Sequence, residues 1–279
     1  MVKMNALTIQ SKKQTWNINI PENWDEVPLH LYPNLAQLYL KGPDRMNETD
    51  KLVRVFCLLA IDAYKGVMQM SDEQLTICLP MIYWVFENLD IQRNPLPSFV
   101  HNNIRYIGPD KELENVRFGE FCMAETFFMQ YWENKDDKIL DKLIATLYRP
   151  AGNGNQYNPK HNTYRGDRRE KFNGNLVDIR AEKFSDLDLA IKDGIYLYYL
   201  ASRWQISFYY PHVFPKKRHQ KINTPTQKTP QYGWMGVFDD LQGERGHTAE
   251  TLEDEFLHTT LLSLERGQIK FKELKLNKK

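Results

Sequence analysis

The residues best suited to chemistry lie between positions 143 and 175, where LIATLYRP is followed by AGNGNQYNPKHNTYRGDRREKFNGN. Arginine and aromatic residues are interleaved along this stretch. A guanidinium group can hold a carboxylate or a phosphate through two parallel hydrogen bonds, and an aromatic ring can stack on a partner. We therefore predict a partner-docking surface formed by side chains of these two kinds: Arg149, Tyr157, Tyr164, Arg165, Arg168, Arg169 and Phe172.

An alternative interpretation of the same stretch is a solvated loop. In that case its basic side chains would pair with the neighbouring Asp167 and Glu170. A loop of this length is uncommon in a compact domain, and is usually functional or becomes ordered on a partner. The GNGN run lacks the lysine and hydroxyl residues that complete a phosphate-binding loop. We therefore favour a protein partner over a nucleotide or another phosphate.

A second basic tract, PKKRHQK, occupies residues 215–221. Lysine and arginine clusters of this kind can contact nucleic acid, although most of them are solvated loops. The candidate nucleic-acid-binding residues in this tract are Lys216, Lys217 and Arg218.

The sequence contains no recognisable catalytic or metal-binding signature. Its seven histidines are dispersed, without HxH or HExxH spacing, and no serine lies in a GxSxG motif. Three acidic pairs could in principle serve a two-metal nuclease, but we expect helix caps or solvated positions instead: Asp136 with Asp137, Asp186 with Asp188, and Asp239 with Asp240. We predict neither enzymatic activity nor a metal or cofactor.

Composition places the chain among globular proteins. Its 279 residues are 42% hydrophobic and 13% aromatic, and the formal net charge is +1. This balance gives no whole-chain electrostatic reason to bind nucleic acid or a membrane. The N-terminus lacks the apolar segment of a signal peptide, so we expect a soluble, intracellular protein. Three isolated cysteines, without metal-ligand spacing, are expected to be buried thiols: Cys57, Cys78 and Cys122.

The secondary-structure elements that must position these residues are predicted to be mainly α-helical and to form a compact helical domain. Alternating apolar residues predict an N-terminal β-hairpin over residues 6–20, and a second small hairpin over 98–107 turns at Asn102-Asn103. Helical periodicity predicts helices over 29–40, 50–63, 71–87, 118–132 and 136–148. The third of these begins with a capping box at Ser71 and Gln74, and we expect it to bend at Pro80.

Three more helices are expected after the arginine-rich loop. Ser185 could cap a helix over 186–207, whose aromatic face would form core or an oligomer interface. A helix over 232–241 should be ended by Gly243 and Gly246, and Thr248 should cap the last one.

These elements suggest four successive parts. A hairpin lead-in covers residues 1–20, a helical half covers 21–149, the docking loop covers 150–175, and a second helical half covers 176–279. Because both halves carry apolar faces, we expect them to pack together as a single domain.

The order of several motifs resembles a known class of proteins. PENWDEV follows the first hairpin, RYIGPDKELENVRFGEF and LDKLIATLYRP precede the RGDRREKFN loop, and YGWMGVFDDLQGERGHTAETLEDEFLHTTL comes late. This pattern resembles uncharacterised virion and tail-morphogenesis proteins of phages and prophages of Bacteroidetes-type hosts. The resemblance covers most of the chain and supplies no catalytic residues.

The resemblance implies a phage assembly role through protein–protein contact, as a tail-assembly chaperone or as a connector or ring component. The implied partners are other phage structural proteins of the tail or head–tail connector, or further copies of the chain. The implied location is the bacterial host cytoplasm during assembly, or the virion. The alternative hypothesis is a nucleic-acid-binding packaging or regulatory factor that uses the basic loops, and a metal-dependent nuclease is a third.

Overall fold

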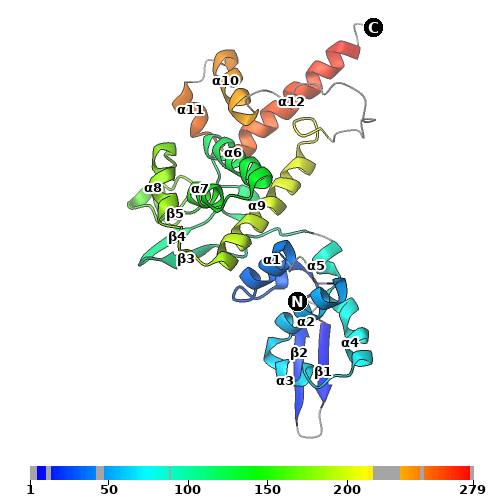
Figure 1. The fold of residues 1–279 in the computed structure, drawn as a ribbon. Coiled ribbons are helices and arrows are strands. Elements are labelled where there is room, and N and C mark those ends of the chain that lie inside the picture. Colours follow the sequence, from blue (N-terminus) through cyan, green and yellow to red (C-terminus); the bar gives the residue numbers. More distant parts are fainter. Residues whose placement is uncertain are drawn as a thin grey trace. The chain divides into compact units, whose positions relative to one another are not determined.

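A computed structural model describes residues 5–10, 14–41, 47–87, 89–215, 233–245 and 248–276. Contacts within the chain group it into two compact units. Unit 1 comprises Met1–Leu96 and Asp188–Ala201, and unit 2 comprises Pro97–Leu187 and Ser202–Lys279. Both units consist mainly of helices, each with one small antiparallel sheet, so the predicted mainly α class is confirmed (Figure 1). Whether the chain forms a single domain stays a prediction.

The N-terminal hairpin of unit 1 is confirmed. Strands β1 (Asn5–Gln10) and β2 (Thr15–Ile20) pair antiparallel, with Asn5 opposite Ile20 and Gln10 opposite Thr15. Ile9 and Ile20 are buried. A two-stranded hairpin is marginal by itself, so this buried face anchors it to the helices of unit 1.

Unit 1 contains the helices α1 (Tyr32–Lys41), α2 (Glu48–Leu59), α3 (Tyr64–Val67), α4 (Asp72–Cys78) and α5 (Trp84–Glu87). The Asn47 side chain caps α2, whereas α3 begins without a side-chain cap. The capping box at Ser71 and Gln74 is confirmed at the start of α4. The expected bend at Pro80 is a complete break, because a 3₁₀ turn over Leu79–Ile82 separates α4 from α5.

The long helix α9 (Leu189–Tyr209) contributes its first part to unit 1 and its last part to unit 2. The Tyr32 hydroxyl donates to the Gly194 carbonyl over 2.9 Å, and Lys41 Nζ lies 2.8 Å from Asp193 Oδ1. Three of its tyrosines are buried, as the core interpretation of the aromatic face expects: Tyr196, Tyr198 and Tyr199.

The expected start of this helix at Asp186, capped by Ser185, is wrong. The helix begins three residues later, and Asp188 accepts a hydrogen bond from the Ala190 amide over 2.7 Å. The Ser185 hydroxyl instead donates to the Glu182 carbonyl. Both residues are good caps, and the turn that follows α8 (Val177–Glu182) decides between them.

The small hairpin of unit 2 is also confirmed. Strands β3 (Ser98–His101) and β4 (Ile104–Ile107) are joined by Asn102 and Asn103, whose φ angles are 48° and 60°. Asparagine tolerates this left-handed conformation better than most residues, which favours a tight two-residue turn. A third strand that the sequence does not predict, β5 (Arg149–Pro150), pairs with β4.

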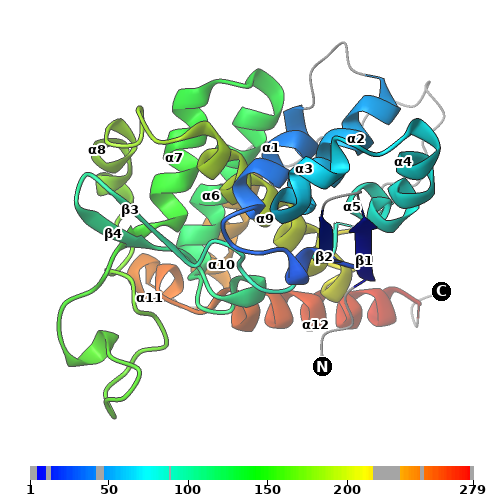
Figure 2. The ribbon, with the colours of Figure 1, turned by 90° about the horizontal axis from the view of Figure 1, so that it is seen from below.

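Two helices lead directly into β5. Helix α6 (Phe118–Asn134) is followed by α7 (Asp137–Leu147), and Asp136 caps α7 by accepting from the Lys138 amide, as expected. The segment after β5 projects beyond β3 and β4 in Figure 2 (green). Its ends are closed by hydrogen bonds from Gly152 N to Arg168 O and from Glu170 N to Pro150 O.

The C-terminal helices of unit 2 differ from expectation in two ways. Helix α10 (Gly233–Arg245) continues through Gly243, and Thr248 caps only the short α11 (Ala249–Glu253). The last helix, α12 (Leu257–Leu276), is separate. The break has a tertiary cause, since Phe118 N donates to Glu255 O and Leu257 N donates to Val116 O between the two helices.

Two chain-wide expectations concern the cysteines and the membrane. Cys78 and Cys122 are buried free thiols and Cys57 is half-buried. Burial raises the pKa of all three thiols. Across the described ranges, no helix combines the length and the apolar character required to cross a bilayer.

Candidate functional site: an arginine cluster and its pocket

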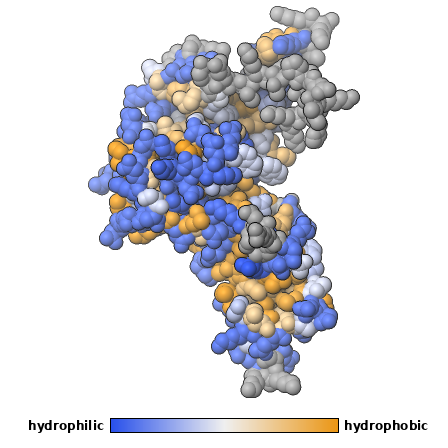
Figure 3. Space-filling model, viewed as in Figure 1, coloured by the Kyte–Doolittle hydropathy of each residue, from blue (hydrophilic) through white to orange (hydrophobic). Residues whose placement is uncertain are grey.

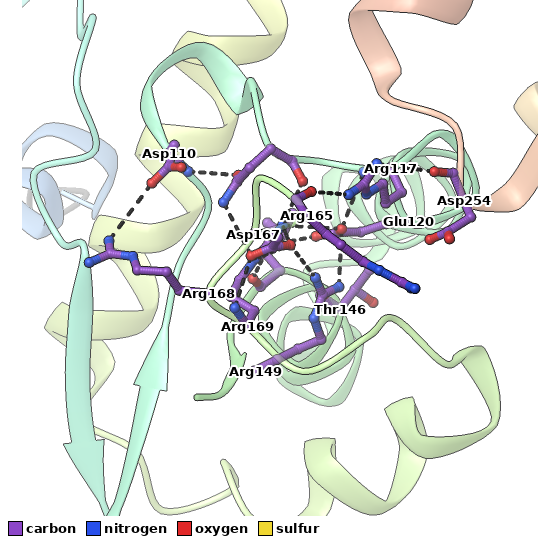
Figure 4. Close-up of polar contacts among 12 residues, drawn as sticks. Asp110, Arg117, Glu120, Thr146, Arg149, Arg165, Asp167, Arg168, Arg169 and Asp254 are labelled. Atoms are coloured by element: carbon purple, nitrogen blue, oxygen red, sulfur yellow. Dashed lines mark hydrogen bonds and ion pairs between the residues drawn. The ribbon is translucent and has the colours of Figure 1, made fainter. Parts of the chain in front are cut away.

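Two of the predicted docking arginines lie inside unit 2, at the point where the loop returns to β5. Arg149 is 1% exposed and Arg169 is 0% exposed. Both contact the carboxylates of Glu120, on α6, and Asp167, in the loop (Figure 4). The site is therefore a buried four-residue cluster, here called the arginine cluster, rather than a row of exposed guanidinium groups.

Arg169 is held on all sides. Its Nη1 lies 2.7 Å from Glu120 Oε1, and its Nε and Nη2 lie 2.9 Å from Asp167 Oδ1 and Oδ2 respectively. Its remaining hydrogen bonds end on two backbone carbonyls, those of Leu147 and Asn115. This arrangement satisfies the donors of the guanidinium group, as a buried cation requires.

Arg149 is held less completely. Its Nη1 lies 3.0 Å from Glu120 Oε2, and its Nη2 lies 3.1 Å from Asp167 Oδ2. Its guanidinium carbon lies 5.6 Å from the centre of the Phe172 ring. The Nε atom is buried and has no acceptor among the residues that the structure describes.

The charges of the cluster balance, with two guanidinium groups against two carboxylates. Burial lowers the pKa of Arg149, and the positive charge of Arg169 lowers it further. Burial also acts to lower the pKa of Arg169, but the charges of Glu120 and Asp167 outweigh it and raise that pKa. Arg169 is thus the cation that the carboxylates favour most, and both arginines are charged at neutral pH.

Local structure explains how the carboxylates reach the arginines. Glu120 occupies the third position of α6, where it also accepts a weak hydrogen bond of 3.4 Å from the Arg117 amide. Asp167 accepts from the Arg169 amide over 2.9 Å and from Asn115 Nδ2 over 3.3 Å. Sequence reasoning missed Glu120 and Asn115. The N3 glutamate of α6 is a detectable helix-start signal, but nothing local ties it to an arginine 49 residues later.

A small pocket of about 50 Å³ adjoins the cluster. It is lined mainly by basic and aromatic side chains from the loop, from the start of α6 and from the end of α11: Arg117, Arg149, Tyr157, Arg165, Asp167, Arg169, Lys171, Phe172 and Asp254. Five of the seven predicted docking residues are therefore gathered around one pocket.

The basic residues at this pocket differ in how they are held. Arg117 stacks on Phe256, with 3.6 Å between the guanidinium carbon and the ring centre, and donates to the carbonyls of Asp254 and Arg165. Lys171 Nζ lies 3.6 Å from Asp254 Oδ2. Arg165 is exposed, and its guanidinium group has no hydrogen bond or ion pair to the described parts of the chain.

The remaining predicted docking residues lie apart from the pocket. Arg168 Nη2 is 3.9 Å from Asp110 Oδ1, and both side chains are about half exposed. Burial raises the pKa of the half-buried Tyr164, and the charges of Asp110 and Asp167 raise it further. Lys216, Lys217 and Arg218 lie outside the described residues.

The loop follows the alternative interpretation in part. Its arginines do pair with Asp167, and Arg180 Nη2 lies 2.8 Å from Glu170 Oε2. Arg149 and Arg169 do not form an exposed docking surface in this conformation, because both are enclosed and border only the small pocket beside them. Of the four predicted docking arginines, all of which the structure describes, Arg165 and Arg168 are exposed.

Metal ligands do not gather within the described ranges, where no group of three or more histidine, cysteine or acidic side chains could hold an ion. Of the acidic pairs, Asp186 Oδ1 lies 3.1 Å from His101 Nε2, and Asp239 and Asp240 are exposed. Comparison with protein-family models, with curated proteins and with solved structures finds no match to this chain.

Proposed function

We propose that this chain is a phage virion morphogenesis protein that acts by protein–protein contact, either as a tail-assembly chaperone or as a connector or ring component. The motif order described above supports the phage assignment. The mode of action is supported by one structural observation, a set of large aromatic side chains exposed on unit 2: Trp132 (54% exposed), Trp204 (62%), Phe208 (68%) and Tyr209 (50%).

Large aromatic side chains support a role in protein–protein contact because leaving them exposed to water is unfavourable in free energy. Trp204 and Phe208 are four residues apart on α9, so they lie on one face of the helix. Tryptophan and tyrosine dominate the residues whose removal most weakens protein interfaces. The visible face of unit 2 over α7 and α8 is largely hydrophilic, with scattered apolar residues, and does not carry these aromatic rings of α9 (Figure 3).

The direct test is co-purification of the chain with virion proteins from infected or induced cells. We expect tail or connector proteins to be recovered with it, and W204A/F208A to reduce their recovery by about tenfold or more, since two interface anchors are removed. The matched control is M68A/I77A, which removes two equally exposed apolar side chains from unit 1. Recovery of no virion protein, or equal recovery with both variants, would contradict the proposal.

Mass spectrometry of mature particles separates the two subtypes. A chaperone should be absent from the particle, whereas a connector or ring component should be present in stoichiometric amount.

A further inference from the structure

We propose that the pocket beside the arginine cluster binds the carboxylate group of an acidic side chain from a protein partner. The inference deepens the proposed function and rests on it for the nature of the partner. It is carried by an unpartnered buried donor, by the local charge and by the size of the pocket.

The first observation is the Nε–H group of Arg149. This atom is buried without an acceptor in the described chain, although the two terminal nitrogens of the same guanidinium group are both paired. A buried donor left without an acceptor loses its hydrogen bonds to water and gains none in return, which is energetically unfavourable. Arg149 lines the pocket, so an oxygen atom placed there is the natural acceptor.

The second observation is the charge around the pocket. Five lining residues are cationic, two lining residues are carboxylates, and Glu120 adds a third carboxylate behind them. Five positive charges against three negative ones leave a net charge of +2. Arg165, which also lines the pocket, adds an exposed guanidinium group without an ion-pair partner among the described residues; its side chain extends away from the cluster in Figure 4. Guanidinium groups bind oxyanions through charge-assisted hydrogen bonds.

The third observation is the size, which selects among oxyanions. The volume is about 50 Å³. Each water-sized atom needs roughly 10–15 Å³, so about three to five heavy atoms fit. A carboxylate, with three heavy atoms, fits over this whole range, whereas a phosphate group, with five, fits only at its upper end. Asp254 on the pocket wall would also repel the second negative charge of a phosphate group more than the single charge of a carboxylate.

The walls favour a peptide side chain over a free ion. Tyr157 and Phe172 line the pocket beside the basic groups. Aromatic rings at this position can cover the methylene groups that precede the carboxylate of a glutamate, which a small free anion lacks. We therefore expect an acidic peptide to bind more tightly than acetate.

The experiment is a titration of the full chain with a decapeptide that contains four glutamates. Binding is measured by calorimetry and by the NMR signal of the Arg149 Nε–H group. We expect saturable binding and a shift of that signal. The same peptide with glutamine in place of glutamate should not bind. R165M should lower the affinity for the glutamate peptide by about tenfold, because the substitution removes a charge-assisted hydrogen-bond donor. The matched control R266M, on the exposed part of α12, should leave the affinity unchanged.

Two results would overturn the inference. One is the absence of saturable binding, or equal binding of the glutamate and glutamine peptides. The other is displacement of the peptide by inorganic phosphate at lower concentration than by acetate, which would assign the pocket to phosphate. Because the peptide needs no virion partner, its failure is distinguishable from a failure of W204A/F208A to reduce co-purification.

Discussion

At the scale of single residues, the arginines of one short loop have different roles. Arg168 and Arg169 are neighbours, yet Arg168 is half exposed and Arg169 is enclosed. The neighbour that faces Glu120 becomes part of the core, and the other stays available to solvent. Replacing all the loop arginines together would therefore mix an effect on folding with an effect on binding.

Arg169 gives the first prediction. R169A should lower the free energy of unfolding by about 3–5 kcal/mol, because it leaves two buried carboxylates without their main partner. R168A should cost less than about 1 kcal/mol, since its ion pair with Asp110 is long and exposed. Urea unfolding followed by circular dichroism measures both. Equal effects of the two substitutions would show that the arginine cluster contributes little to stability.

At the scale of elements, hydrogen bonds between segments far apart in the sequence fix how helices and strands are joined. β5 exists because the end of α7 leads straight to the edge of β4, and the loop closes on itself beyond it. The C-terminal helix α12 is tied in a similar way to the turn after α9. Glu265 on α12 accepts from the backbone amides of His212 and Val213, over 2.9 and 3.0 Å, and lies 2.5 Å from His212 Nδ1.

This link predicts a pH dependence. Burial acts to raise the pKa of Glu265, but the hydrogen bonds from His212 and Val213 outweigh it and lower that pKa. A lowered folded-state pKa stabilises the fold above the unfolded value of about 4.3, and the contribution disappears as the pH falls through the folded value. The stability difference between the natural chain and E265Q should therefore be present at pH 7 and shrink below about pH 4.

Urea unfolding at pH 7 and at pH 3 measures that difference. E273Q, an exposed position on the same helix, serves as the control and should behave like the natural chain at both values. A difference for E265Q that stays constant with pH would mean that the carboxylate charge does not hold α12.

At the scale of the whole molecule, one helix belongs to both compact units. The first part of α9 packs within unit 1, through Tyr32 and Lys41, and its last part belongs to unit 2. Arg203, in that last part, places its Nε 2.8 Å from Glu125 Oε1 on α6. Of the three places where the chain passes from one unit to the other, the one at residues 201–202 therefore lies inside a continuous helix, whereas those at 96–97 and 187–188 lie in non-helical segments.

This organisation predicts that unit 2 does not fold normally when residues 1–96 are removed. A fragment of residues 97–279 would lack Tyr32 and Lys41, and the buried groups of α9 that they contact would be exposed. We expect a lower melting temperature than for the full chain, and association on size-exclusion chromatography. A monomeric fragment that melts cooperatively at the temperature of the full chain would instead establish two independent domains.

The sequence by itself determined the features that depend on neighbouring residues. The hairpin turn at Asn102-Asn103, the capping box of α4 and the cap of α7 follow from local backbone and side-chain preferences, and they occur as predicted. It also identified the loop whose residues gather around the pocket. Where two residues could each cap a helix, as Ser185 and Asp188 could, the local sequence did not determine at which of them the helix begins.

Only the tertiary structure decided which arginines are buried. Arg169 meets Glu120 across 49 residues, and a short range of sequence contains no information about that pairing. The same holds for the break between α11 and α12, which forms where the chain pairs with residues 116–118. Burial depends on which distant segments are brought together, whereas caps, turns and periodicity depend on neighbours. For this reason the loop was recognised from its composition, while the role of each arginine followed from the fold.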